Sequence, residues 1–302
     1  MAKQPATKIP SPVGPVIFIA AAVGEILAYL AYGSLVPLAV LGASAVAFVI
    51  GLYDDFSVLG GKVKPILLLF AFVPVLVALL YEPDLYAARL FFPVLGATGA
   101  HFTIYTLLAI AGFPIVANAF NAMDSLNGQM SGFTVLVSLA LIIGTILRSL
   151  AEPTFSLVRL AATLPLLAVS TAFYIFNRFP SRAFDGNSGS LMLGTMFAAL
   201  AITDGVEIAA IIAILPAILN QFYILASVRG FVERRQMGSR PTYMTADGLL
   251  HASGDPTAPS TLIRLVLLPG PLTEKELVKN ILLLTSVTCL LSVLTSVLTW
   301  VH

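Results

Sequence analysis

Long apolar stretches recur along almost the whole of this 302-residue chain, and they limit its fold more than any other feature. About 20 helical residues cross the hydrocarbon core of a bilayer. A spanning segment must be helical there, because every backbone N–H and C=O group needs a partner within the protein. With 58% hydrophobic and only 10% charged residues, the chain has no room for a large soluble domain. We predict an all-α, polytopic integral membrane protein that forms one transmembrane domain over residues 1–302.

About nine transmembrane helices can be placed on these stretches. They are expected at residues 16–32, 35–53, 66–81, 102–119, 132–147, 160–176, 190–203, 208–228 and 281–301. The 190–203 stretch is short for a span. The number of crossings decides which loops share a side of the membrane, so the distribution of basic residues tests the assignment.

Basic residues fall mainly in loops that nine crossings place on one side. Those loops are segments 1–15, 54–65, 120–131, 177–189 and 229–280. Their thirteen basic residues are Lys3, Lys8, Lys62, Lys64, Arg178, Arg182, Arg229, Arg234, Arg235, Arg240, Arg264, Lys275 and Lys279, against Arg89, Arg148 and Arg159 on the other side. Because positively charged loops stay in the cytoplasm, we predict a multi-pass protein of the cell membrane with its N-terminus inside and its C-terminus outside. The net charge of only +1 gives no bulk attraction to nucleic acid.

Two adjacent acids form the first polar group at the end of a predicted span. Asp54 and Asp55 end the second apolar stretch, and Lys64 precedes Pro65 at the start of the third. Neighbouring carboxylates at a membrane surface are costly unless a cation or a proton is shared between them. A lysine at the start of a helix favours phosphate. The segment therefore indicates a catalytic pair with a phosphate-binding lysine, and two solvated acids in a turn remain the alternative.

A row of amides forms the second group. Asn118, Asn121, Asp124 and Asn127 recur at intervals of three before Gly128, which would place them along one side of a helix end. Asparagine side chains can bind the edge of a base or offer a neutral oxygen to magnesium. Hydrogen bonding between membrane helices is the alternative.

A glycine-rich turn forms the third group. Asp185, Gly186 and Asn187 stand before the seventh predicted span, and Ser188 and Ser190 can cap the helix that follows. Backbone N–H groups at such a helix start favour an anion. We interpret the turn as facing a phosphate, although a simple connector has the same composition.

Segment 229–279 is the only sizeable soluble element, and we expect it to be a small cytoplasmic subregion that contains a hairpin. Residues 243–251 predict two short strands that turn at Asp247-Gly248. The pattern from Thr273 to Glu276 fits a capping box at the start of the last helix. His251 and Arg264 could meet a sugar nucleotide, or they could be ordinary surface residues.

Taken in order, these motifs resemble the polyprenyl-phosphate N-acetylhexosamine-1-phosphate transferases. They read G-L-Y-D-D-F, N-A-F-N-A-M-D-S-L-N-G and F-N-R-F-P-S-R-A-F-D-G-N-S-G-S, and a long loop precedes the last span. The resemblance implies transfer of a sugar 1-phosphate from a UDP-N-acetylhexosamine to polyprenyl or dolichyl phosphate with release of UMP. It also implies Mg²⁺, or Mn²⁺ in its place, contact with membrane lipid, and the option of a homodimer. The family has ten helices, and the segment beginning at Lys8 resembles the one before its second helix, so nine are expected here.

The resemblance also implies roles for single residues. It gives the acidic pair and lysine to catalysis, the amides to metal and uridine, and the third motif to substrate and metal. The expected catalytic residues are Asp54, Asp55 and Lys64; the substrate-binding residues are Asn118, Asp124, Asn127, Gly128, Arg182, Phe184, Gly186, His251 and Arg264; the metal ligands are Asn121, Asn187 and Asp185.

One position departs from the family pattern. The third motif of the family ends Phe-x-Gly-Asp with a metal-binding aspartate, where this chain has Asn187 and an acid two residues earlier, Asp185. We consider, in this order, that the metal is held more weakly and mainly through the UDP-sugar, that Asp185 replaces the charge, or that the chain is catalytically impaired. A histidine-rich stretch of the family is also absent from the long loop, which favours UDP-GlcNAc over the muramoyl-pentapeptide substrate.

Two other functions are consistent with the same polar residues. A secondary transporter also carries carboxylates and amides in its membrane segments, although it concentrates them near the midplane. A non-catalytic family member that binds nucleotide or lipid would keep the motifs without the reaction.

Overall fold

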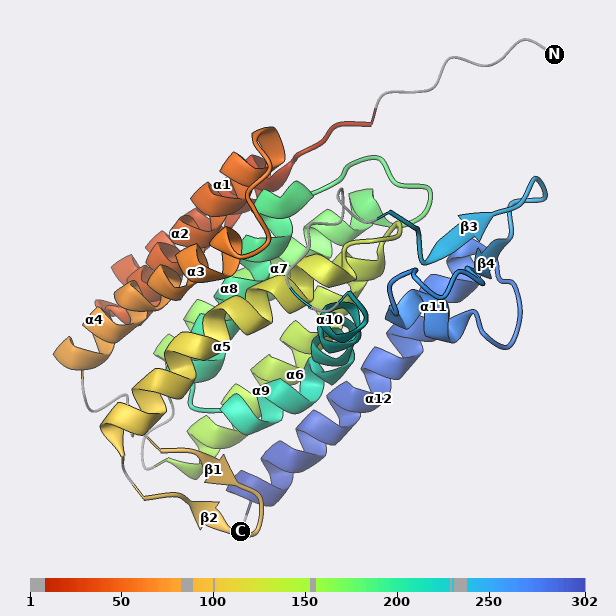
Figure 1. The fold of residues 1–302 in the computed structure, drawn as a ribbon. Coiled ribbons are helices and arrows are strands. Elements are labelled where there is room, and N and C mark those ends of the chain that lie inside the picture. The colour runs from red at the N-terminus through yellow and green to blue at the C-terminus, as the bar shows by residue number, and fades with distance from the viewer. Residues whose placement is uncertain are drawn as a thin grey trace.

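The chain forms a bundle of long helices with two small hairpins at its ends (Figure 1). It is represented by a computed structural model that describes residues 9–82, 89–99, 101–152, 156–228, 230 and 238–301. The long helices are α1 (Gly14–Tyr32), α2 (Val36–Phe56), α5 (Phe102–Met123), α6 (Gln129–Ala151), α7 (Leu157–Asn177), α8 (Gly186–Thr203) and α12 (Glu274–Trp300). The prediction of a mostly helical membrane protein is confirmed.

Shorter elements complete the bundle. The segments α3 (Val63–Leu68), the 3-10 turn η1 (Leu69–Phe72) and α4 (Val73–Tyr81) form one interrupted span, and α9 (Glu207–Ala213) and α10 (Leu215–Ser227) form a pair bent by 67°. The remaining elements are the strands β1 (Phe91–Phe92), β2 (Gly96–Ala97), β3 (Thr242–Met244) and β4 (Leu250–Ala252) and the short helix α11 (Leu262–Val266).

The number of spans is close to the nine expected. Within the described ranges, seven helical segments are long and apolar enough to cross a membrane, and the bent α9–α10 pair gives an eighth. Helix α8, which the sequence places at 190–203, begins at Gly186 and lies inside the bundle. The count of nine, which includes α8, stays a prediction.

Helix α8 forms the centre of the bundle. Every residue from Ser188 to Thr203 is buried, and the helix packs against α2 and α5. Small residues allow this close packing: a Cβ atom on Gly51 of α2 would lie 2.5 Å from the carbonyl oxygen of Asn187 and 2.6 Å from Cα of Ser188. Contact between α2 and the start of α8 therefore requires glycine at position 51.

Replacing Gly51 with Ala is expected to destabilise the protein by about 1–3 kcal/mol, because the added methyl group forces backbone of α2 and α8 apart. Thermal unfolding in detergent measures this loss. Gly60→Ala is the matched control, since the nearest atom to its new Cβ is a side-chain methyl of Val63 at 3.8 Å. Equal melting temperatures for the two variants would contradict the packing described here.

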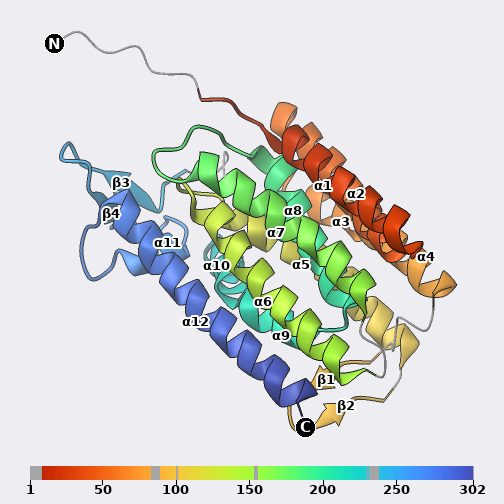
Figure 2. The ribbon, with the colours of Figure 1, turned by 180° about the vertical axis from the view of Figure 1, so that it is seen from behind.

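The loops predicted to be cytoplasmic gather at one end of the bundle. Figures 1 and 2 show the start of α1, the connection from α7 to α8 and the β3–β4 hairpin at this end, and β1, β2 and the C-terminus at the other. This arrangement agrees with the predicted parity of the crossings, while the orientation in the membrane stays a prediction. Of the basic residues used for it, Lys3, Lys8, Arg229, Arg234 and Arg235 lie outside the described residues.

A buried polar network holds the helices together at the other end. Glu152 pairs with Arg148 at 3.2 Å and with Arg159 at 2.5 Å. Asp204, which follows α8, accepts hydrogen bonds from Thr145 at 2.6 Å and Thr163 at 2.9 Å. Buried polar groups are costly unless they are paired, and these pairs join α6 and α7 to the end of α8.

The long segment before α12 contains the predicted hairpin. Strands β3 and β4 pair antiparallel, with Tyr243 opposite His251, and Gly248 in the turn has φ of +84°. The capping box of Thr273 and Glu276 is present at the start of α12. Both local predictions are therefore confirmed.

Candidate active site

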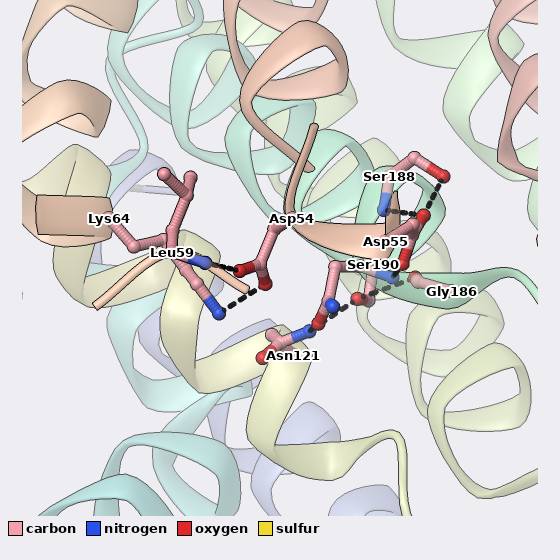
Figure 3. A network of polar contacts seen from close by, with 9 residues as sticks. Asp54, Asp55, Leu59, Lys64, Asn121, Gly186, Ser188 and Ser190 are labelled. Carbon is pink, nitrogen blue, oxygen red and sulfur yellow. Dashed lines mark hydrogen bonds and ion pairs between the residues drawn. The ribbon is translucent and has the colours of Figure 1, made fainter. Parts of the chain in front are cut away.

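Asp54 forms a buried ion pair at the junction of α2 and α3. Its Oδ2 lies 2.7 Å from Nζ of Lys64, and the two side chains are 3% and 7% exposed. Oδ1 of Asp54 accepts a hydrogen bond of 2.7 Å from the backbone N–H of Leu59 (Figure 3). A buried charge is tolerated when it is paired in this way, so the pair predicted from the first motif is assembled by the turn between the two helices.

Asp55 points away from Asp54 and caps α8. Its Oδ1 accepts a 2.7 Å hydrogen bond from the N–H of Asn187, and its Oδ2 accepts bonds from the N–H of Ser188 at 3.1 Å and from the Ser188 hydroxyl at 2.6 Å (Figure 3). A carboxylate at a helix N-terminus satisfies free N–H groups and interacts favourably with the helix dipole. The sequence interpretation of Ser188 and Ser190 as the caps of this helix is wrong, because an acid 132 residues upstream of Asn187 does this instead.

Two amides from distant motifs meet beside this cap. The Asn121 side chain, near the end of α5, donates to Oδ1 of Asn187 at 2.7 Å and to the hydroxyl of Ser190 at 2.8 Å. Ser190 in turn donates to the carbonyl of Gly186 at 3.0 Å. The two asparagines expected at a metal site are therefore in direct contact, and Asp55 joins them to the end of α2.

The row of amides does not continue along one helix. Helix α5 ends at Met123, Asp124 follows it, and Asn127 lies in the turn to α6. Asn118 donates to the carbonyl of Pro114 one turn back in its own helix, at 2.8 Å. The predicted stripe of four is therefore wrong beyond Asn121: the chain turns at 124–128 because Gly128 adopts φ of +77°, which permits the reversal into α6.

Asn177 is a residue of this region that we did not select from the sequence. Its Oδ1 accepts hydrogen bonds from the N–H of Gly128 at 3.1 Å and the hydroxyl of Ser131 at 2.7 Å, and its Nδ2 donates to the carbonyl of Ala183 at 2.9 Å. It thereby fixes the second motif against the third. The sequence signal that could have identified Asn177 is its place in F-N-R-F at the end of a predicted span.

Asp185 is fully buried beside the first turn of α8. Neither oxygen of its carboxylate has a hydrogen-bond partner among the described residues, and its side chain lies against Gly189, where an added Cβ would be 2.5 Å away. Burial, together with the negative charges of Asp124 and Asp55, raises the pKa of Asp185 well above its ordinary value. Such a carboxylate is stabilised by a bound cation or by a proton.

The other residues of the third motif differ in how deeply they are buried. Gly186 has φ of +72°, and a side chain there would strike Asp55. Phe184 is half-buried, and its N–H and C=O groups bond Pro10 and Val13 of the segment before α1. Arg182 is exposed, and its guanidinium carbon lies 5.3 Å from the ring centroid of Phe176.

The two residues chosen from the long loop contact other residues of that same loop. Arg264 donates to the carbonyls of Ala258 at 2.6 Å and Asp255 at 3.0 Å, so it braces its own loop. His251 stacks on Tyr243 with ring centroids 5.2 Å apart. Their predicted role in sugar binding stays a prediction, and the contacts described give it no support.

The assembled site joins a lysine, two carboxylates of α2 and two amides at one end of the bundle. Lys64 supplies positive charge, the start of α8 supplies N–H groups, and Asn121 and Asn187 supply amide oxygens. Groups of these kinds bind phosphate and hard cations. The arrangement is suited to chemistry on a phosphate ester at the membrane surface.

Comparison with known proteins also indicates chemistry on a phosphate ester. Residues 37–205 match glycosyl transferase family 4. Over 257 residues the chain is 27% identical to the UDP-N-acetylglucosamine–dolichyl-phosphate N-acetylglucosaminephosphotransferase of Dictyostelium discoideum, covering 76% of this chain and 60% of that protein. A protein of Saccharolobus solfataricus provisionally given the same name is 28% identical over 205 residues, covering 67% of this chain and 60% of that protein.

A bacterial enzyme is similar as well. The phospho-N-acetylmuramoyl-pentapeptide-transferase of Deinococcus radiodurans is 31% identical over 202 residues, which cover 60% of this chain and 56% of that protein. The chain thus spans roughly three fifths of the length of these relatives. The family match extends over more than half of the chain and includes all three polar motifs. The chain belongs to glycosyl transferase family 4.

Proposed function

We propose that this chain transfers N-acetylhexosamine 1-phosphate, with GlcNAc 1-phosphate as the preferred group, from a UDP-sugar to polyprenyl or dolichyl phosphate. An oxygen of the lipid phosphate forms a new bond to the sugar-bearing phosphorus, the bond from that phosphorus to UMP breaks, and UMP leaves with the bridging oxygen. The observation that carries the proposal is the meeting of Asn121 and Asn187 beside the α8 cap formed by Asp55. The named activities of the relatives support the same reaction.

The residues of α2 and α3 have distinct tasks in this proposal. Two anionic phosphates must approach each other, so positive charge has to be fixed in the site before they meet. Lys64 is held by Asp54 and can turn to the diphosphate of the UDP-sugar when it binds. Asp54 then keeps the attacking phosphate oxygen free of its proton. Asp55 keeps the start of α8 in place and acts as a positioning residue.

The residues present also fit a magnesium ion. Asp185 has two buried carboxylate oxygens without a hydrogen-bond partner in the described chain. Asn187 follows it by two residues, and the amide of Asn121 donates to the amide oxygen of Asn187. These three residues would hold Mg²⁺, or Mn²⁺, through oxygen ligands. When bound, the ion supplies charge that offsets the repulsion between the two phosphates. Of the three interpretations of Asn187, replacement of the missing charge by Asp185 now has the strongest support.

We place the reaction at the cytoplasmic surface of the cell membrane. The support is the clustering of the site with the basic loops at one end of the bundle (Figure 1). The lipid substrate would reach the site from the membrane and the nucleotide sugar from the cytoplasm. A homodimer stays a prediction.

The proposal is tested by incubating the purified chain with UDP-GlcNAc and a polyprenyl phosphate and by measuring UMP. We expect release of one UMP for each lipid-linked GlcNAc phosphate formed, and no release without the lipid. UDP-GalNAc and UDP-MurNAc-pentapeptide serve as comparison substrates. Exchange of UDP-sugar across liposomes without UMP formation would support a transporter instead.

Asn187→Asp is expected to lower the Mg²⁺ concentration needed for half-maximal activity about tenfold, because a carboxylate binds Mg²⁺ more strongly than a neutral amide. The oxygen of the new side chain can still accept the hydrogen bond from Asn121. Titration of UMP release with Mg²⁺ measures the effect. A gain in maximal rate of several orders of magnitude would instead show that the natural chain has an impaired site.

A further inference from the structure

A concave site lies between α6, α7 and the start of α12, and Asn127 and Gly128, two of the expected substrate-binding residues, stand at its edge. It is a cavity of about 490 Å³, within the range of small-molecule sites. We call it the basic groove and define it by the cations Arg178, Lys275 and Lys279 and the apolar residues Leu136, Leu282 and Leu283. Its lining includes Gly128, the residue that precedes α6, and Gly132 in the first turn of that helix.

The three cations at the groove form no ion pair with an acid at contact distance among the described residues, although Glu276 interacts with Lys279 at longer range. In the part of the chain that the structure describes, no ion pair involves Arg178, Lys275 or Lys279. The acids at the start of α12 serve the backbone: Glu274 accepts the N–H of Asn127 at 2.8 Å, and Glu276 closes the capping box. Lys275 lies 5.1 Å from the ring centroid of Phe179, which holds its ammonium group at the mouth. The groove itself is therefore lined by cations and by no acid, and Glu276 offsets their charge only in part.

The groove changes from charged to apolar along α12. Lys275 and Lys279 lie in its first two turns, whereas Leu282 and Leu283 follow deeper in the span. From Lys275 to Leu283 the helix advances about 12 Å, at 1.5 Å per residue. An occupant that fits this gradient has an anionic head at the membrane surface and a hydrocarbon chain below it.

The groove lies on the far side of the molecule from the ion pair of Asp54 and Lys64. Figures 1 and 2 both show α12 at the side opposite α2 and α3. A lipid in the groove cannot place its phosphate beside Asp54, so it differs from the attacking substrate. We infer that the basic groove binds an anionic phospholipid, with its phosphate at Arg178, Lys275 and Lys279 and one acyl chain along Leu282 and Leu283.

Native mass spectrometry of the purified full chain tests this inference with phosphatidylglycerol and phosphatidylcholine as probes. We expect phosphatidylglycerol to be retained in preference to the zwitterionic lipid. Lys275→Gln combined with Lys279→Gln should weaken its retention about 30-fold, because each basic residue near an anionic lipid contributes about a fivefold increase in affinity. The matched control is Lys62→Gln with Arg240→Gln, which removes two exposed cations away from the groove.

A second variant tests the hydrocarbon part without changing charge. Ser286→Phe should fill the lower end of the groove, since Ser286 lines it, and should reduce retention while the cations remain. Equal retention by the wild type, the double lysine variant and Ser286→Phe would overturn the inference. So would a wild-type dimer that binds no phosphatidylglycerol, because a second copy would then cover the groove. Lipid retention is independent of UMP release, so this test and that of the proposed function fail separately.

Discussion

Replacing Asp54 with Asn is expected to lower the rate of UMP release by about 10²–10⁴-fold, the usual contribution of a positioned acid–base group. The carboxylate is 3% exposed and lies 2.7 Å from the ammonium group of Lys64, so its charge both accepts the proton and holds the lysine. The substitution keeps the size of the side chain and removes that charge. Single-turnover measurement of UMP with saturating polyprenyl phosphate reports the change in the chemical step.

Asp55→Asn is the matched control for this variant. It removes the charge of the neighbouring acid but keeps one oxygen that can accept the N–H of Asn187. A smaller loss of rate, together with a lower melting temperature from the weakened cap, is expected. If Asp54→Asn kept the wild-type rate, or if only Asp55→Asn abolished it, the roles given to the two acids would be wrong.

Asp185→Asn is expected to abolish the stabilisation of the protein by Mg²⁺ and to remove most of the magnesium-dependent activity. Asp185 is the only fully buried acid of the third motif, and both of its oxygens lack a hydrogen-bond partner in the described structure. Ligands that bind only the folded protein raise its melting temperature, so a thermal shift with and without Mg²⁺ measures the loss directly. A wild-type thermal shift in the variant would exclude Asp185 as a ligand.

The same variant should stabilise the metal-free protein at neutral pH. Burial raises the pKa of Asp185 above its ordinary value of 3.8, so the folded chain retains a proton that the unfolded chain releases. The stabilising effect of this proton is present in full below about pH 4 and is lost as the pH rises through the folded-state pKa. Asp185→Asn removes this dependence, so its advantage in melting temperature should be larger at pH 7 than at pH 4. Asp247→Asn should show the opposite sign, because hydrogen bonds from Thr245 and from the N–H of Leu249 lower the pKa of this exposed carboxylate, so the variant loses stability at pH 7 relative to low pH.

The sequence predicted the elements that depend on local pattern. Apolar stretches located the spans, the Asp247-Gly248 pair located the hairpin, and Thr273 with Glu276 located the start of α12. The predicted helix bounds were less accurate for a helix that is surrounded by other helices instead of by lipid. Helix α8 begins at Gly186, four residues before the predicted span, because a helix surrounded by other helices can carry Gly, Asn and Ser in its first turn.

The bend in the eighth predicted span also had a local signal. The stretch 208–228 is apolar except for Asn220, Gln221 and Ser227, yet it divides into α9 and α10 at Ile214, where Pro216 stands in the first turn of the second helix. Proline cannot donate a backbone hydrogen bond to the preceding turn. Hydropathy alone therefore predicted one straight span.

The sequence identified the motifs of the site but not their contacts. Asn118 and Asn121 have the same spacing pattern, yet one bonds its own helix and the other crosses to α8. Asp54 and Asp55 are adjacent, yet they face a lysine on α3 and the N–H groups of α8. Which partner each side chain meets depends on how α2, α5 and α8 pack together, and residue spacing within one helix does not contain that information.

The most direct test of the central claim is electron–nuclear double resonance of the chain loaded with Mn²⁺ and UDP-GlcNAc. If the ends of α2, α5 and α8 surround one metal-bound diphosphate, the spectrum should show strong ³¹P coupling to the ion, and Asp185→Asn should lose it. Mn²⁺ that binds without ³¹P coupling, or coupling that persists unchanged in Asp185→Asn, would contradict the account.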